Sequence, residues 1–145
     1  MLEIDKMFEA AIALRDEGHL KEAVLGFLAI ITKFPHDSKI GLVHTILGGV
    51  YLDLKDYHNS SLSFKNGTRL NPKSELASLG LYLSYVKLDR DKEAINELKR
   101  YLDEYPANMY KDTLEELLED MKKGFATAYK KTIFHFAKKN GVITK

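Results

Sequence analysis

Apolar side chains recur along most of the chain at intervals of three and four residues, as in Leu47, Val50, Tyr51 and Leu54. This is the spacing of one face of an α-helix, and no segment has the sustained alternation that predicts a strand. The fold class is therefore predicted to be all-α. Between turn-like segments, the periodicity predicts helices over residues 3–17, 20–33, 39–54, 57–70, 74–88 and 91–104. Asn71 is the predicted N-cap of the fifth helix, with Pro72 at its first position.

The spacing of the three prolines indicates an internal repeat. Pro35, Pro72 and Pro106 are 37 and 34 residues apart, and similar residues precede each of them at four fixed distances. The matching sets, from the nearest to the farthest, are Phe27, Phe64 and Leu98; Ala23, Ser60 and Ala94; Leu14, Tyr51 and Tyr85; and Ala10, Leu47 and Leu81. Unrelated helices would not share four distances, so the chain is predicted to contain three helix pairs, at about 4–37, 41–74 and 75–108.

The middle unit resembles a tetratricopeptide repeat (TPR), through Leu47-Gly48, Tyr51, Phe64 and Pro72. The resemblance implies a single domain over residues 1–145, a right-handed α-solenoid of three TPR helix pairs plus a long C-terminal amphipathic helix. The third unit departs from the family pattern, because Tyr82 and Tyr101 stand where small residues are usual. These two departures predict looser or altered packing of whatever follows the third pair.

The family resemblance also implies a binding groove lined by one face of each first helix. The repeat register places twelve residues there: Asp5, Phe8, Ile12 and Arg15; Leu42, Thr45, Gly49 and Leu52; and Leu76, Leu79, Leu83 and Val86. Eight of the twelve are large and apolar. Phe8, Ile12, Leu79 and Leu83 stand where the chaperone-binding subclass grips a terminal carboxylate with Lys, Arg and Asn, so no such carboxylate clamp is expected. The groove is therefore expected to bind an amphipathic helix or an extended apolar segment. The leucines of the third pair could instead be covered by the chain's own C-terminal helix, or by self-association.

The C-terminal segment, residues 109–140, does not fit a fourth repeat, since Glu115, Glu116 and Glu119 fall at positions that require Leu, Gly and Tyr. Its apolar residues stay in phase across Gly124, which favours one long helix, straight or bent, over a hairpin. Gly141 is the predicted stop. The second half of this helix could dock in the groove, form a homodimer or contact a partner. Its candidate second surface consists of Phe125, Tyr129, Phe134 and Phe136.

Charge is unevenly distributed over the 145 residues. Residues 1–120 carry 15 Lys or Arg against 21 Asp or Glu, whereas residues 121–145 carry seven Lys and no acid, so balances of −6 and +7 give the net +1. The lysines could contact nucleic acid, but a solvated face that complements the helix dipole explains them more simply, so nucleic acid is an unlikely partner. The absence of Cys, of an N-terminal signal peptide and of a membrane-length apolar stretch predicts a soluble, cytoplasmic protein that does not contact membranes.

Candidate chemistry is sparse. The five histidines form no metal-ligand spacing, and the sequence contains no nucleophile elbow or phosphate-binding glycine loop. His44 takes the place of the family's usual Trp and is predicted to be a packed histidine. Gly48 is predicted to allow close helix packing and Gly49 to face the groove. The serines at 60, 61 and 63 and the carboxylates at 115, 116, 119 and 120 are expected on solvated helix faces. The chain is therefore predicted to be no enzyme and to need no cofactor or metal.

The leading hypothesis is a protein–protein interaction module that binds a segment of another protein through the apolar groove and the C-terminal helix. Two alternatives are an immunity-type inhibitor of a bacterial toxin and a secretion chaperone for an exported protein. A basic-tail nucleic-acid binder would show affinity that falls steeply with salt. A self-assembling scaffold would show a concentration-dependent dimer.

Overall fold

The computed structural model describes residues 1–124 and 127–142, and within them the chain forms eight α-helices, one short 3-10 helix and no strand. The first six helices are α1 (Glu3–Asp16), α2 (Leu20–Lys33), α3 (Ile40–Asp53), α4 (Tyr57–Leu70), α5 (Glu75–Lys87) and α6 (Asp91–Glu104). They are followed by α7 (Tyr110–Lys122), η1 (Thr127–Tyr129) and α8 (Lys130–Lys139). The prediction of an all-α fold is confirmed. No end of the first six helices differs from its predicted position by more than one residue.

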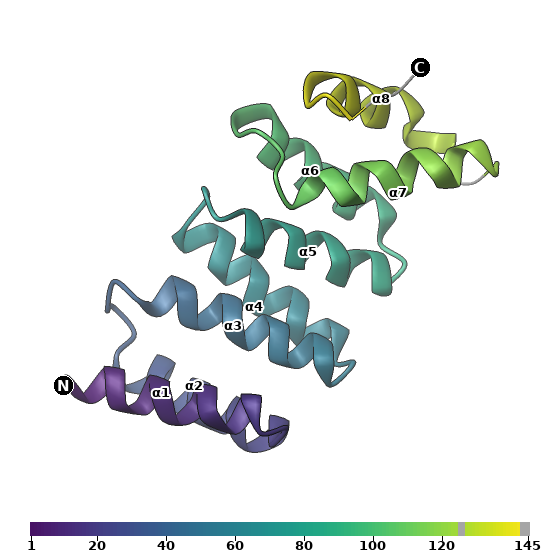
Figure 1. The fold of residues 1–145 in the computed structure, drawn as a ribbon. Helices are drawn as coiled ribbons and strands as arrows, with labels where there is room; N and C mark the ends of the chain where they lie inside the picture. Colours follow the sequence, from purple (N-terminus) through teal and green to yellow (C-terminus); the bar gives the residue numbers. More distant parts are fainter. Residues whose placement is uncertain (125–126, 143–145) are drawn as a thin grey trace.

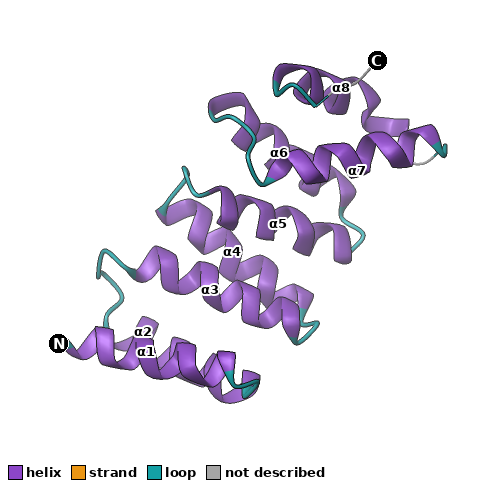
Figure 2. Cartoon of the chain, in the orientation of Figure 1, coloured by secondary structure: helices purple, strands orange, loops and turns teal. Residues whose placement is uncertain are grey.

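The helices pack as sequential antiparallel pairs: α1 with α2, α3 with α4, α5 with α6, and α7 with α8. Figure 1 shows α1, α3, α5 and α7 one after another along the length of the molecule, with α2, α4 and α6 behind them. Only short loops and turns join the helices (Figure 2). In the described part of the chain, every helix is too short or too polar to cross a membrane.

The start of α5 differs from its prediction. Ser74, not Asn71, is the N-cap: its backbone is extended, and its hydroxyl accepts a hydrogen bond of 3.1 Å from the Ala77 N–H. Asn71 instead ends α4, where its own N–H donates to the Gly67 carbonyl at 2.9 Å. Pro72 consequently lies in the connecting turn. Ser and Asn are comparably good caps, so the local sequence did not decide between the two residues.

The interior consists of two main clusters of buried apolar side chains. The first joins α1, α2 and α3 through residues such as Phe27, Ile30 and Leu47. The second joins α5, α6, α7 and α8 through residues such as Leu98 and Tyr110. The first cluster thus joins the first pair to the second, the other cluster joins the third pair to the fourth, and α4 packs against α5 between them.

The serines of α4 were expected in solvent, and that expectation is wrong. Ser60, Ser61 and Ser63 are all buried, at 0%, 4% and 7% exposure. The hydroxyl groups of Ser60 and Ser61 have partners: both lie within hydrogen-bond distance of backbone carbonyls of their own helix, and the Ser60 and Ser84 hydroxyl oxygens are 2.8 Å apart. Small side chains at these positions let α4 and α5 approach closely.

Tyr82 and Tyr101, the two large residues of the third pair that stand where small ones are usual, pack against the start of the next helix. Tyr110, at the start of α7, is fully buried between Tyr82 and Tyr101, with ring centroids 6.0 and 5.7 Å away. Its hydroxyl group forms a 2.8 Å hydrogen bond with Ser78 of α5. The packing after the third pair is thus altered rather than loose, because large aromatic rings fill the space that small residues would leave.

The C-terminal segment is a helix pair, so the prediction of one long helix is wrong. Helix α7 ends at Lys122, and Gly124 follows with a φ of +91°, a left-handed conformation that terminates helices and favours glycine. The prediction weighed only the cost of glycine inside a helix, about 1 kcal/mol. The fold-back is stabilised by burial of the second half against α6, which the apolar phase alone does not encode.

Helix α8 packs on the chain's own α6. Ile133, Phe136 and Ala137 are buried, and Phe136 and Ala137 belong to the same cluster as Leu98 and Leu102 of α6. Two hydrogen bonds hold the end of α8 in place: Asn140 Oδ1 accepts from the Ala107 N–H at 2.8 Å, and Lys139 Nζ donates to the Leu102 carbonyl at 2.9 Å. The predicted stop at Gly141 is confirmed by its φ of +69°.

Candidate functional site

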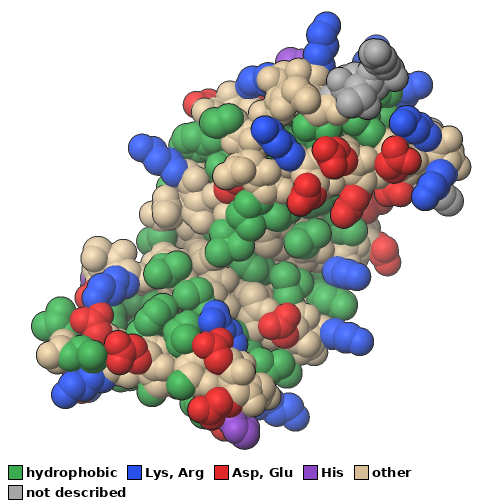
Figure 3. Space-filling model, viewed as in Figure 1, with side chains coloured by type: hydrophobic (Ala, Val, Ile, Leu, Met, Phe, Trp, Pro, Cys, Tyr) green, Lys and Arg blue, Asp and Glu red, His purple; other side chains and the backbone are tan. Residues whose placement is uncertain are grey.

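An apolar hollow of about 470 Å³ lies between α3 and α5, and we call it the α3–α5 groove. Most of its lining comes from these two helices, with Arg15 of α1, Phe64 of α4 and Met109 at the start of α7 completing it. The residues from α3 and α5 are Thr45, Ile46, Gly49, Val50, Leu52, Asp53, Leu76, Leu79, Gly80 and Leu83. Figure 3 shows hydrophobic side chains gathered over α1, α3 and α5 on this face.

The floor of the groove depends on two glycines that contact one aromatic ring. A Cβ added at Gly48 would lie 2.8 Å from ring carbons of Phe64, and one added at Gly80 would overlap the same ring. Phe64 is 3% exposed, so its ring is enclosed between α3 and α5. The predicted role of Gly48 in close packing is confirmed. Gly49 has no atom within 4 Å of its added Cβ and lines the groove, as predicted.

Seven of the predicted groove residues line this hollow: Arg15, Thr45, Gly49, Leu52, Leu76, Leu79 and Leu83. Leu76 and Leu83 are 48% and 40% exposed, so neither is covered by the described part of the chain. Thr45 is 4% exposed, and its hydroxyl group donates to the Gly41 carbonyl at 3.0 Å, so it contributes mainly its methyl group. Met109 was missed, because it belongs to a segment that does not fit the repeat.

The other five predicted groove residues lie elsewhere. Asp5 does not line the hollow and forms an ion pair with Lys39. Phe8 and Ile12 pack against the N-terminal core, where the Phe8 ring meets Phe27 edge-on at 6.1 Å. Leu42 and Val86 are exposed, at 52% and 38%, but line no part of the hollow. The predicted 3-4-3 spacing found three of its four α5 residues in the hollow, and only Arg15 of its four α1 residues. Helix α1 has no preceding pair and turns Phe8 and Ile12 toward the core that it shares with α2 and α3.

Only some residues of the predicted second surface are accessible to solvent. Phe136 is 1% exposed and belongs to the core, so its placement on a surface is corrected. Phe134 is 38% exposed, with the Lys130 ammonium 5.7 Å from its ring centroid, and Tyr129 is half-buried. Phe125 lies outside the described residues.

An acidic surface borders the groove at α7. Five carboxylates of α7 are exposed, as predicted for those at 115, 116, 119 and 120; the set is Asp112, Glu115, Glu116, Glu119 and Asp120. Figure 3 shows these acidic side chains along α7, next to the hydrophobic area over α5. Inside the groove, the charges are Arg15, which pairs with Asp16 at 2.8 Å, and Asp53. The groove itself is therefore apolar, and its α7 border is negative.

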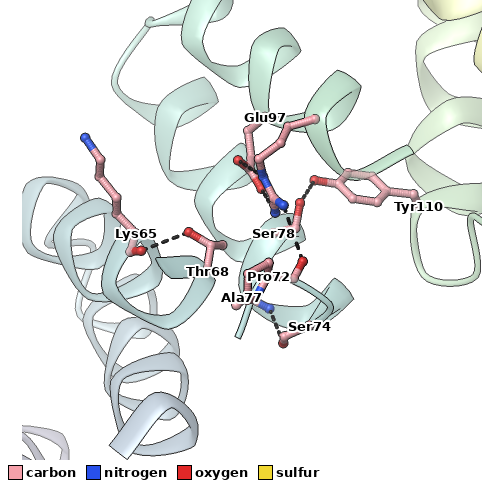
Figure 4. Close-up of polar contacts among 9 residues, drawn as sticks. Lys65, Thr68, Pro72, Ser74, Ala77, Ser78, Glu97 and Tyr110 are labelled. Atoms are coloured by element: carbon pink, nitrogen blue, oxygen red, sulfur yellow. Dashed lines mark hydrogen bonds and ion pairs between the residues drawn. The ribbon is translucent and has the colours of Figure 1, made fainter. Parts of the chain in front are cut away.

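A second hollow of about 570 Å³ lies between α4 and α6, over side chains of α5. Glu97 on its wall is 8% exposed and is held by Arg100, whose guanidinium donates to both carboxylate oxygens at 2.9 and 2.7 Å. Arg100 also donates to the Pro72 carbonyl at 3.3 Å, and Figure 4 shows these contacts beside the Ser78–Tyr110 hydrogen bond. Within this wall, Glu97, Arg100 and the Pro72 carbonyl satisfy one another.

Burial shifts the pKa values of His44 and Tyr82 in opposite directions. Burial, and then the charge of Arg69, lowers the pKa of His44, whose Nδ1 finds no hydrogen-bond partner among the described residues. Burial, reinforced by Asp91, Glu116 and Asp120, raises the pKa of Tyr82 to about 12.

No cluster of three or more metal-ligating side chains occurs in residues 1–124 and 127–142. In comparisons with known proteins, no family model and no curated protein matches the sequence.

Proposed function

We propose that this chain is a TPR-type α-solenoid whose function is to bind another protein through the α3–α5 groove. The family assignment rests on the residues of the middle repeat and is supported by the sequential antiparallel pairs. It is also supported by the tight contact of Phe64 with Gly48 and Gly80. Stacked helix pairs commonly use the face of their first helices as a binding surface.

The observation that carries this proposal is an apolar hollow that residues 1–124 and 127–142 leave open. On α5, Leu76 is 48% exposed and Leu83 is 40% exposed, and Met109 beside them is 43% exposed. The chain's own α8 packs on α6 instead of in the groove. Apolar surface that is both concave and uncovered is typical of protein-binding sites.

The test is affinity purification from the native cell with three forms of the protein: wild type, Leu83→Glu and Leu62→Glu. Leu83 lies in the groove, whereas Leu62 on α4 is 48% exposed and lies outside it, so the second variant is a matched control. We expect a partner, identified by mass spectrometry, that the wild type and Leu62→Glu retain and Leu83→Glu loses. Circular dichroism checks that both variants keep the wild-type helix content.

Equal recovery of every partner by all three forms would refute binding through the groove. Unfolding of Leu83→Glu alone would identify Leu83 as a core residue. In that case Gly49→Leu takes its place, because Gly49 lines the groove and a Cβ added there meets no atom within 4 Å.

A further inference from the structure

The faces of α5 and α7 that meet at the groove differ sharply in chemistry. On α5 the groove face consists of Leu76, Leu79 and Leu83, spaced by three and four residues. On α7 the face begins at Met109, which lines the groove, and the same helical spacing continues it through Asp112, Glu116 and Asp120. An apolar stripe and an acidic stripe therefore lie next to each other (Figure 3).

The acidic stripe has little internal compensation. Among the described residues, Glu119 pairs with Lys122 at 3.3 Å, while Asp112, Glu116 and Asp120 form no ion pair. Of the residues that the structure describes, Lys123 is the one cation lining the hollow beside these carboxylates. The effect of the carboxylates reaches α5, since Glu116 and Asp120 contribute to the raised pKa of Tyr82. A bound segment would therefore meet a negative field along one side.

The size of the apolar stripe favours a helical occupant. Leu76 and Leu83 are seven positions apart, or about 10 Å along the helix, which matches about two turns of an opposing apolar helix face. The lining consists of side chains on helices, and the described residues contain no strand whose edge could pair with an extended peptide. Packing of an amphipathic helix against such a stripe is a common recognition mode.

A second copy of the chain is a poorer occupant, although its α8 is basic. The large apolar side chains of α8 face its own core, where Ile133 and Phe136 are at most 1% exposed. Phe134 is the large apolar side chain that α8 leaves exposed, at 38%. One partly exposed ring cannot supply the apolar face that the groove requires.

We infer that the α3–α5 groove binds a basic amphipathic helix of a partner protein. The apolar face of the partner helix packs on the leucines of α5, and its Lys or Arg side chains lie over the acidic stripe of α7. This inference rests on the proposed function and specifies the chemistry of the partner. The apolar contact supplies most of the affinity, and the charges set orientation and selectivity.

The experiment uses two synthetic amphipathic peptides of about 16 residues, about 24 Å long as helices. Both carry the same leucine stripe, and one carries Lys where the other carries Glu. Calorimetry with the full chain should show the basic peptide binding about tenfold more tightly, which corresponds to about 1.4 kcal/mol. This preference should shrink at high salt, because exposed charges are screened.

Two charge-reversed proteins provide the matched comparison. Glu116→Lys/Asp120→Lys changes the groove-side stripe, and Glu115→Lys/Glu119→Lys changes the next side of the same helix by the same net charge. The first variant should lose or invert the preference for the basic peptide, whereas the second should keep most of it. Leu83→Glu should weaken both peptides at least about tenfold.

Each other outcome overturns the inference in a distinguishable way. If both peptides bind equally and Leu83→Glu loses both, the groove is correct and the charge argument is wrong. If neither peptide binds, the helical basic ligand is wrong, while the capture experiment with Leu83→Glu still judges the proposed function. A dimer that sedimentation detects in the wild type but not in Leu83→Glu would identify a second copy as the occupant.

Discussion

Gly48 and Gly49 are adjacent in α3, yet replacing each with alanine is expected to change the free energy of unfolding in opposite directions. A Cβ at Gly48 would lie 2.8 Å from two ring carbons of Phe64 and 2.9 Å from a third, whereas carbon atoms pack best at about 3.5–4.0 Å. The ring cannot move away, because its far edge fills the space beside Gly80. A Cβ at Gly49 would meet nothing within 4 Å. Both residues are inside the helix, so both substitutions gain the same helix propensity.

The magnitudes follow from these contacts. Overpacking costs about 1–3 kcal/mol, and the enclosed Phe64 ring puts Gly48→Ala near the upper end. Replacing glycine with alanine inside a helix returns about 1 kcal/mol. We therefore expect Gly48→Ala to lower the free energy of unfolding by about 2 kcal/mol, and Gly49→Ala to raise it by up to about 1 kcal/mol.

Urea unfolding followed by circular dichroism measures both changes. A Phe64→Leu background provides the control, because a smaller side chain makes room and Gly48→Ala should cost less there. If Gly48→Ala is as stable as the wild type, the ring relaxes easily and the tight contact of Phe64 with α3 does not hold the pair together. If Gly49→Ala is strongly destabilising, the groove is not open at that residue.

Two further predictions concern helix capping and pH. Glu75 accepts hydrogen bonds from the N–H groups of Asn108 and Tyr110 at 2.8 and 3.0 Å, so Glu75→Ala should cost about 1 kcal/mol and speed amide exchange in α7. The exposed Glu104→Ala is the control, and equal exchange in the two variants would contradict the capping role. Because folding lowers the pKa of His44 from its ordinary value near 6.5, the unfolded chain binds more protons, and this contribution to stability is lost as the pH falls below about 6.5. Urea unfolding at about pH 7.5 and about pH 5.5 should show a smaller pH effect in His44→Leu than in the wild type; an unchanged effect would show that His44 does not contribute.

Much of the chain's local structure could be predicted from the sequence. The first six helices appear where periodicity places them, since the 3.6-residue repeat of a helix is written in consecutive residues. The different environments of Gly48 and Gly49 were predicted correctly, because the repeat register assigns each residue to a side of its helix. Seven residues of the α3–α5 groove followed from the same register.

The tertiary structure decided what depends on contacts between distant residues. The left-handed Gly124 and the return of α8 onto α6 depend on burial of Phe136 against residues more than thirty positions away, and the apolar phase is equally compatible with one long helix. The burial of Ser60 depends on its hydrogen bond to Ser84, and the place of Phe8 depends on α2. Helical periodicity specifies which face of a helix is apolar, whereas packing determines which neighbour covers that face and which face stays open.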